Sequence, residues 1–451
     1  MPFSRLRGEA GTLLGAQLVF NLGFYAVIPF LAGAMGDDYG LDAVAVGLVL
    51  GARTFSQQGM FLAGGLLADR WGARRAILLG CLVRISGYAV LAAASNFSLF
   101  LLGAVLTGAG GALFSPALES QLSRADHATE GSRPDGGKTG RRSVFVWLSI
   151  TGEIGALLGP VLGAFLLGWG FDAALALGMG ILCAVTVLLW FRLPVHPPRK
   201  PTTTKAPEPE AASAGHRGAL GCLRNRRFVV FCLLASTNML AYNQLYFAVP
   251  VELGRRSLDA SWLGGLFLLA SVLTLVLQLP VSAAGQRLGP GRSLSVGFVL
   301  LGAAFVTAAL TAEHAGSSGS SIVPLAGAIA LLILGHMLLT PTILSLIPKF
   351  LPGDGAAGGR GAYYGLAASC GGISVLLGNA VMGQLVDLTD RLHWWPGSPW
   401  LPPVLLALLA ALALPRVLPA KSPRGEFRGW PQRIGRPGRP EGILPSVERL
   451  P

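Results

Sequence analysis

The chain has 451 residues, of which 52% are hydrophobic and only 13% are charged, and its formal net charge is +13. A soluble domain carries about 25% charged residues, and a soluble chain of this length would need polar surface around several cores. Together with a mean hydropathy of +0.59, this composition excludes a soluble protein and predicts that most of the chain lies in lipid.

Twelve segments are apolar over the roughly 20 residues that a helix needs to cross a bilayer. In chain order they are 9–33, 43–67, 74–95, 97–118, 143–168, 172–194, 227–251, 259–284, 293–312, 322–346, 362–385 and 398–418. The first is longer than the apolar core of a signal peptide, so we expect it to remain as the first span. The sequence therefore predicts an all-α polytopic membrane protein with twelve transmembrane helices.

Positive charge is distributed unevenly between the two sides of these spans. Of the 35 Lys and Arg residues, 30 fall in the segments of one side and three in those of the other. The positive-inside rule then places both termini in the cytoplasm. Topology accounts for the basic composition, so no nucleic-acid partner is expected. The five cysteines form no CxxC pair, and neither a disulfide framework nor a metal site is expected.

The longest inner segment divides the spans into two groups of six. We predict an N-terminal six-helix half (1–194), a cytoplasmic linker (195–226), a C-terminal half (227–418) and a disordered basic cytoplasmic tail (419–451). An offset of 217 residues places Arg70 on Arg287, Gly72 on Gly289 and Arg75 on Arg292. Two related, pseudo-symmetric halves are typical of secondary transporters, whose substrate site lies at the interface of the halves near the midplane.

Polar residues repeat at helical spacing in three spans and predict a substrate cavity. The residues are Gln17, Asn21 and Tyr25 in the first span, Asn238, Tyr242 and Tyr246 in the seventh, and Ser271, Thr274 and Gln278 in the eighth. A cavity that mixes aromatic rings and amides suits a bulky, amphipathic ligand. The alternative is that these side chains only bond neighbouring helices to one another.

Ionisable residues inside spans are costly and suggest a function. Arg53, with Gln57 one turn later, and Glu153 each lie ten residues into a span, near the midplane. Either Glu153 carries a coupling proton and attracts cationic substrate while Arg53 adjusts its proton affinity, or the two form a static ion pair. His336 is a second candidate for proton coupling, unless it is simply hydrogen-bonded.

The loop between the second and third spans, GGLLADRWGARR, resembles the signature loop of the major facilitator superfamily. The matching residues are Gly65, Asp69, Arg70, Gly72, Arg74 and Arg75. In the fifth span, GEIGALLGPVLG is similar to a motif of the drug:proton antiporter branch, and ARTFSQQG is similar to one group of multidrug resistance transporters. Many antiporters carry an arginine in the fourth span where this chain has Ala104, so a proton relay would use other residues.

The resemblance implies a major facilitator fold and roles for both motifs. In the family the acid of the loop, here Asp69, caps the eleventh span, which begins near Arg360, and closes the inner gate. The alternative is that the loop charges only set topology. Gly155, Gly159 and Gly163, beside Pro160, form a bare face for helix packing, which in the family lies against the eighth span.

From these patterns we expect a secondary transporter that exports small amphipathic or drug-like compounds in exchange for protons. The alternative is a metabolite or sugar facilitator or symporter of the same fold. No P-loop or nucleophile-elbow motif is present, so an enzyme is not expected. We expect no cofactor, a proton gradient as driving force, a small-molecule substrate and the lipid bilayer as partners, and a monomer in the cytoplasmic membrane of a bacterium.

Overall fold

The computed structural model describes residues 2–61, 63–64, 67, 71–130, 144–193, 222–256, 258–259, 261–312, 322–351 and 360–418. At 2–9, 123–130, 144–146, 149 and 360–361 it describes the backbone alone. Residues 1–418 belong to one compact unit. The predicted linker lies outside the described residues apart from 222–226, and the predicted tail lies wholly outside them.

The described part of the chain consists of helices joined by short turns and contains no strand. The first half comprises α1 (Pro2–Gly33), η1 (Ala34–Asp38), α2 (Ala43–Gly59), α4 (Ala73–Ala92), α5 (Phe97–Glu130), α6 (Val144–Leu166), η2 (Leu167–Trp169) and α7 (Phe171–Arg192). The second half comprises α9 (Arg226–Asn243), α10 (Ala248–Arg255), α11 (Ser261–Leu288), α12 (Pro290–Thr311), α13 (Val323–Leu346), η4 (Ile347–Phe350), α14 (Arg360–Leu392), η5 (Ser398–Trp400) and α15 (Leu401–Val417).

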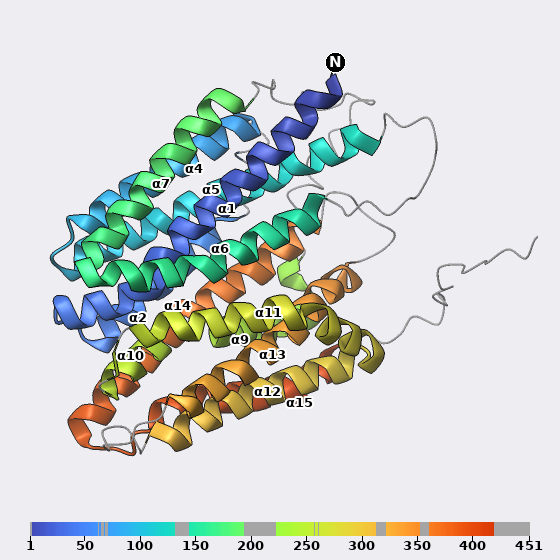
Figure 1. Ribbon diagram of the computed structural model, residues 1–451. Coiled ribbons are helices and arrows are strands. Elements are labelled where there is room, and N and C mark those ends of the chain that lie inside the picture. Colours follow the sequence, from blue (N-terminus) through green and yellow to red (C-terminus); the bar gives the residue numbers. More distant parts are fainter. Residues whose placement is uncertain are drawn as a thin grey trace, which may run out of the picture. The chain divides into compact units, whose positions relative to one another are not determined.

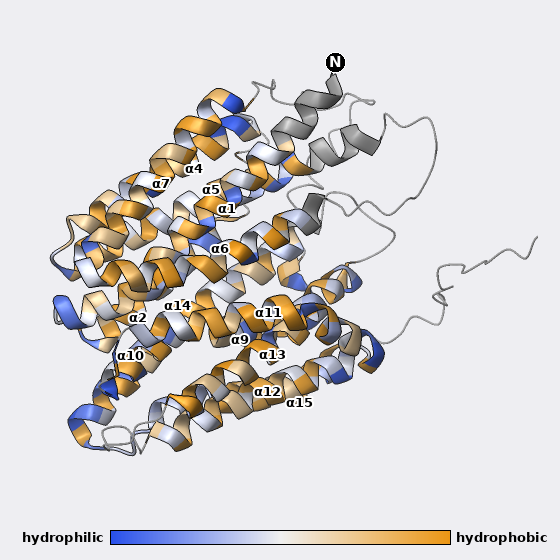
Figure 2. Ribbon diagram, in the orientation of Figure 1, coloured by the Kyte–Doolittle hydropathy of each residue, from blue (hydrophilic) through white to orange (hydrophobic). Residues whose placement is uncertain are grey.

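Ten helices in the described residues are long and apolar enough to cross a membrane, or eleven if α9 and α10 form one bent span. The second predicted span, 43–67, is described as α2 up to Gly59 and only in part beyond it. Large apolar side chains remain exposed along the helices, including Phe165 (66%), Phe191 (78%) and Leu279 (81%). In Figure 2 hydrophobic residues follow the helix bodies, and hydrophilic residues gather at the helix ends.

Each half packs as a group, and the two groups meet along two helix pairs (Figure 1). Within the first half α1 packs on α6 and α7, and α4 packs on α5. Within the second half α12 packs on α13 and α15, and α9 packs on α14. Between the halves α2 packs on α14, and α6 packs on α11. This arrangement confirms the predicted two-half architecture.

The internal repeat is visible in the backbone at two glycines. Gly72 has a φ of +90° immediately before α4, and Gly289 has a φ of +77° immediately before α12. An L side chain rarely adopts this conformation, so both turns require glycine. The first residues of the two helices, Ala73 and Pro290, are also 217 positions apart, as the repeat predicts.

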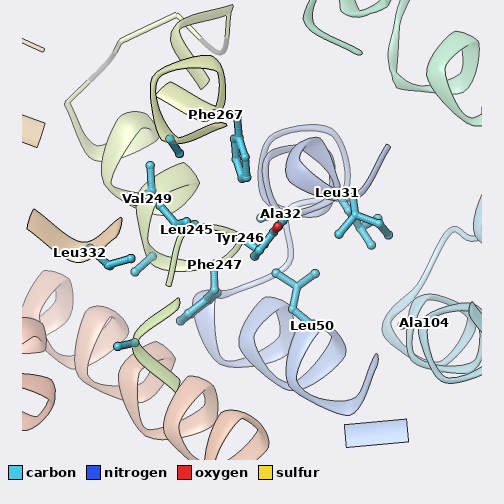
Figure 3. Close-up of a cluster of buried hydrophobic side chains, with 14 of the residues drawn as sticks. Leu31, Ala32, Leu50, Ala104, Leu245, Tyr246, Phe247, Val249, Phe267 and Leu332 are labelled. Atoms are coloured by element: carbon cyan, nitrogen blue, oxygen red, sulfur yellow. The ribbon is translucent and has the colours of Figure 1, made fainter. Parts of the chain in front are cut away.

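A cluster of buried apolar side chains joins the two halves where α1, α2, α10 and α11 meet (Figure 3). Leu31 and Leu50 come from the first half, and Phe247 and Phe267 come from the second. All four are at most 5% exposed. They lie toward the helix ends opposite to the predicted cytoplasmic side, and they close that end of the interface.

Candidate functional site: a central cavity between the halves

A cavity of about 980 Å³ lies between the halves, with walls from α1, α2, α5, α9, α13 and α14. Its polar and aromatic lining includes Phe24, Tyr25, Arg53, Thr54, Gln57, Gln58, Phe61, Glu119, Asn238, Tyr242, Asn243, Tyr246, His336, Thr340 and Tyr364. Phe61, Glu119 and Tyr364 lie toward the predicted cytoplasmic side. Tyr246, which Figure 3 labels within the apolar cluster, lies at the other end, with Tyr25 of α1 beside it.

Three tyrosines from both halves form the closed end of the cavity. Tyr246 is hydrogen-bonded through its side chain to Tyr242 and to Tyr25 on α1. The chain places Tyr246 there because α9 ends at Asn243 and α10 begins at Ala248 after a bend of 42°. Pro250 favours this break, since it has no N–H to donate to the carbonyl of Tyr246 in a continuous helix.

His336 belongs to a polar cluster on the second-half wall. Its Nδ1 lies 3.1 Å from Asn238 Oδ1, and its Nε2 lies 3.3 Å from Thr340 Oγ1. Asn238 also donates to Thr340 Oγ1 at 3.2 Å, and the Tyr242 ring stacks on the imidazole at 4.2 Å. Both ring nitrogens of His336 therefore have a neutral partner.

Two buried arginines stack with aromatic rings behind the first-half wall. The Arg53 guanidinium lies 4.6 Å from the centre of the Phe24 ring, and Arg84 lies 4.8 Å from the same ring and 4.4 Å from Phe20. Arg53 also donates to Gln57 Oε1 at 2.9 Å. Ion pairs in the described residues involve Arg255 and Arg256, so neither buried arginine is paired with a carboxylate there.

The predicted pairing of Arg53 with Glu153 is not present in this structure. Arg53 contacts Gln57 and Phe24 instead. Glu153 on α6 is half-buried and does not line the cavity. The position of a residue along its span gives its depth in the membrane but not the direction in which its side chain points. Two residues at the same depth can therefore face different neighbours.

Five residues that we predicted in the cavity lie outside its lining: Gln17, Asn21, Ser271, Thr274 and Gln278. Asn21 donates to the carbonyl of Gly152 at 3.4 Å, so it joins α1 to α6. Gln17 and Gln278 are half-buried elsewhere on their helices. The cavity role of these residues stays a prediction, and Asn21, on the same face of α1 as Tyr25, contacts α6 in this structure. Tyr25, Gln57, Asn238, Tyr242 and Tyr246 do line the cavity.

The glycine face of α6 packs against α1 rather than α11. A Cβ atom on Gly155 would lie 2.6 Å from Asn21 Cβ, and one on Gly159 would lie 2.5 Å from Tyr25 Cβ. Gly163 is similarly close to the carbonyl of Ala26. The helix that was expected there, α11, approaches Pro160 and Ala164 instead through Gly264. Residues 160 and 164 are one position around the helix from the glycines, so α6 uses two adjacent faces.

Only part of the predicted gating loop can be located. Gly65, Asp69 and Arg70 lie outside the described residues, as does the side chain of Arg360. Arg75 is exposed. Arg74 donates to the carbonyl of Trp190 at 2.6 Å and stacks on its ring. That contact lies within the first half, so Arg74 does not bridge the halves here.

Two polar contacts across the halves were not predicted from the sequence. Asn243 donates to Thr54 Oγ1 at 3.1 Å and accepts from Asn379 at 3.0 Å. Asp387, on α14, accepts from the amides of Ala43 and Val44 at 3.2 and 3.3 Å. Asp387 lies two residues beyond the predicted span 362–385, in the part of α14 that the structure adds, so the span prediction did not draw attention to it.

Two six-helix groups around a central polar cavity define a membrane transporter of the major facilitator type. Residues 13–352 match the Major Facilitator Superfamily, and the chain belongs to that family. An uncharacterized MFS-type transporter of Mycobacterium tuberculosis is 30% identical over 412 residues, which cover 89% of this chain and 91% of the relative.

Other relatives carry names that refer to drug resistance. The multidrug resistance protein MdtH of Aeromonas hydrophila is 28% identical over 88% of this chain and 91% of its own. MdtH of Escherichia coli O157:H7 is 28% identical over 89% and 92%.

Among solved structures, the nucleoside transporter NupG has a TM-score of 0.73 at 14% identity and covers 91% of this chain and 99% of its own. The POT family transporter PepTSo has a TM-score of 0.72 at 16% identity, with 91% and 97% covered. At these identities the structures show the fold alone.

Proposed function

We propose that this transporter exports small amphipathic, drug-like compounds from the cytoplasm by alternating access, in exchange for protons. The observation that carries the proposal is the cavity itself. It measures about 980 Å³ and combines tyrosine and phenylalanine rings with amide side chains from both halves. Such a surface binds bulky ligands with an apolar body and a few polar groups. The drug-resistance names of the relatives support the same substrate class.

The export direction rests on the drug-resistance names of the relatives, and the closed end of the cavity fits it. The apolar cluster and the tyrosines close the end away from the predicted cytoplasmic side. With the termini in the cytoplasm, this is a conformation that receives substrate from inside the cell. Rocking the halves about the α2–α14 and α6–α11 pairs would expose the cavity to the other side.

We assign proton coupling to Glu153, with His336 as the second candidate. Glu153 is a half-buried acid on α6, next to Gly152, whose carbonyl accepts a hydrogen bond from Asn21 of α1. Protonation of Glu153 would neutralise a negative charge near the interface of α1 and α6, and it would need no metal or organic cofactor. Arg53 contributes positive charge to the cavity. We expect the transporter to act as a monomer in the bacterial cytoplasmic membrane.

The test uses inverted membrane vesicles with an imposed proton gradient and a pH-sensitive dye. Tetraphenylphosphonium, naphthalene-2-carboxylate, chloramphenicol and glucose are added in turn to vesicles with the wild type, Glu153→Gln, His336→Gln or Asp172→Asn. Proton release that a hydrophobic compound triggers, and that Glu153→Gln abolishes, is the expected result. Asp172→Asn is the control, because Asp172 is an exposed acid outside the cavity lining.

A metabolite facilitator is the second candidate function, because peptide and nucleoside transporters share this fold. It predicts uptake of a polar solute with no proton movement, and no response to any hydrophobic compound. That outcome would overturn the exporter proposal.

A further inference from the structure

A cation-binding site needs negative charge in its wall, whereas the deep part of this cavity carries positive charge. Among the described residues of the cavity lining, Arg53 is the one arginine or lysine and Glu119 is the one acidic residue. His336 is held between neutral partners. Glu119 lies toward the predicted cytoplasmic side, whereas Arg53 lies on α2 beside Phe24. A ligand held deep in the cavity would therefore meet a positive side chain rather than a negative one.

The Arg53 guanidinium has a buried hydrogen-bond donor without a partner in the described part of the protein. Arg53 is only 7% exposed to solvent, yet it lines the cavity. One of its terminal nitrogens donates to Gln57, while its Nε is buried without a hydrogen-bond partner. A guanidinium can donate five hydrogen bonds, and leaving a buried donor unsatisfied is unfavourable. An acceptor that enters the cavity would satisfy these donors.

A second buried cation adds to the positive potential at this point. Arg84 is 3% exposed, and its Nε also has no partner. Both guanidiniums lie against Phe24, so two like charges are near one another in a region of low dielectric. Ring faces stabilise cations only modestly compared with a carboxylate. An anionic group next to Arg53 would relieve the repulsion between the two arginines.

We infer that Arg53 binds an anionic group of the substrate, and that the cavity takes aromatic carboxylates in preference to lipophilic cations. A carboxylate fits the planar, two-pronged donor edge of a guanidinium. The aromatic body of such a compound would pack against Tyr25, Tyr242 and Tyr246. The inference rests on the proposed function only in taking this cavity as the substrate site.

The experiment compares three probes that share one ring system and differ in charge. Naphthalene-2-carboxylate, naphthalene-2-carboxamide and naphthalen-2-ylmethylammonium are titrated into the purified full-length protein by calorimetry, with protein-free micelles as the blank. We expect the carboxylate to bind at least about tenfold more tightly than the carboxamide, and the ammonium to bind least tightly. Equal binding of carboxylate and carboxamide, or preference for the ammonium, would overturn the inference.

Variants then assign the preference to Arg53. Arg53→Gln should abolish the preference for carboxylate while carboxamide binding is retained, and Arg53→Lys should keep part of it. Arg287→Gln removes an exposed arginine outside the cavity and should change nothing. A carboxylate preference that survives Arg53→Gln would refute the assignment. If Arg53→Gln does not fold, the three-probe comparison on the wild type still decides the charge preference.

The calorimetric test of this inference and the vesicle test of the proposed function can fail independently of each other. Carboxylate preference without any proton movement in vesicles would leave the inference intact and reject proton coupling. Proton release driven by tetraphenylphosphonium, with no carboxylate preference, would reject the inference and leave the exporter.

Discussion

The carboxylate of Asp387 on α14 accepts a hydrogen bond from the backbone amide of Ala43, the first residue of α2, at 3.2 Å. The same carboxylate accepts from Val44, and Asp42 accepts from Ala45 at 2.9 Å. Two acids thus satisfy three amides at the start of α2, where the helix dipole is positive. Asp387 comes from the other half, so this contact holds the halves together at the end opposite to the predicted cytoplasmic side.

We predict that Asp387→Asn favours the conformation in which that end is open. The amide side chain lacks the charge that the helix dipole stabilises, and we expect a loss of about 1 kcal/mol, or roughly a fivefold change in the population of the two conformations. Spin labels at the exposed positions Asp38→Cys and Arg391→Cys, in a background without the native cysteines, should report a longer distance by electron paramagnetic resonance. Asp390→Asn is the control, because Asp390 pairs with Arg255 inside one half. An unchanged distance distribution in Asp387→Asn would contradict the closing role.

The contact of α6 with α1 predicts that Gly159→Ala destabilises the protein. A methyl group there would lie 2.5 Å from Tyr25 Cβ and 2.9 Å from the carbonyl of Leu22, and neither atom can move without the helix. We expect a loss of about 1–3 kcal/mol in the free energy of unfolding, measured by thermal denaturation in detergent. Gly180→Ala, where the added methyl group meets open space, should be neutral or slightly stabilising. Equal stability of the two variants would show that α1 and α6 are not in close contact.

The two turns of the internal repeat predict a matched pair of effects. Gly72→Ala and Gly289→Ala should each cost about 1–3 kcal/mol, because both positions have a positive φ that an L side chain rarely adopts. Gly291→Ala lies two residues later, inside α12, where the added methyl group makes only an ordinary contact with Pro415, and it should have little effect. Thermal denaturation of all three variants checks the prediction. A harmless Gly289→Ala would argue against equivalent turns in the two halves.

The unpaired charge of Arg84 predicts a gain in stability when it is removed. Replacing a buried charge with an apolar side chain of similar length is often neutral or stabilising, so we expect Arg84→Met to raise the free energy of unfolding by about 1 kcal/mol. Arg74→Met should lower it, since Arg74 donates to Trp190 and stacks on its ring. Denaturation midpoints of the two variants can be compared directly. Strong destabilisation by Arg84→Met would mean that the cation is structurally necessary.

Much of the fold could be predicted from the sequence, because lipid imposes a simple rule on length and hydropathy. Spans, halves and the repeat glycines Gly72 and Gly289 follow from apolar runs, loop charges and an offset that can be counted along the chain. The C-terminal end of α9 was harder to predict from the sequence. Its break at Asn243 lies inside an apolar run, and only Pro250 hinted at it.

The site was predicted less well, because helix rotation is set by packing between elements. Tyr25 and Asn21 are one turn apart on α1, yet Tyr25 faces the cavity and Asn21 bonds to α6. The expected partner of Arg53 was an acid, but the structure supplies aromatic rings. Periodicity identifies a polar face, and it does not say which neighbour that face meets.

The central claim is that protons drive transport through the cavity. Uphill accumulation of a test compound in proteoliposomes tests this claim most directly. Purified protein is reconstituted, a proton gradient is imposed, and accumulation of naphthalene-2-carboxylate and tetraphenylphosphonium is followed for three forms of the protein. We predict that the wild type and Leu377→Trp, which changes an exposed apolar position on α14, accumulate at least one of the two compounds. Asn238→Trp, which fills the cavity beside His336, should accumulate neither. Accumulation that persists in Asn238→Trp, or that needs no proton gradient in the wild type, would contradict the account.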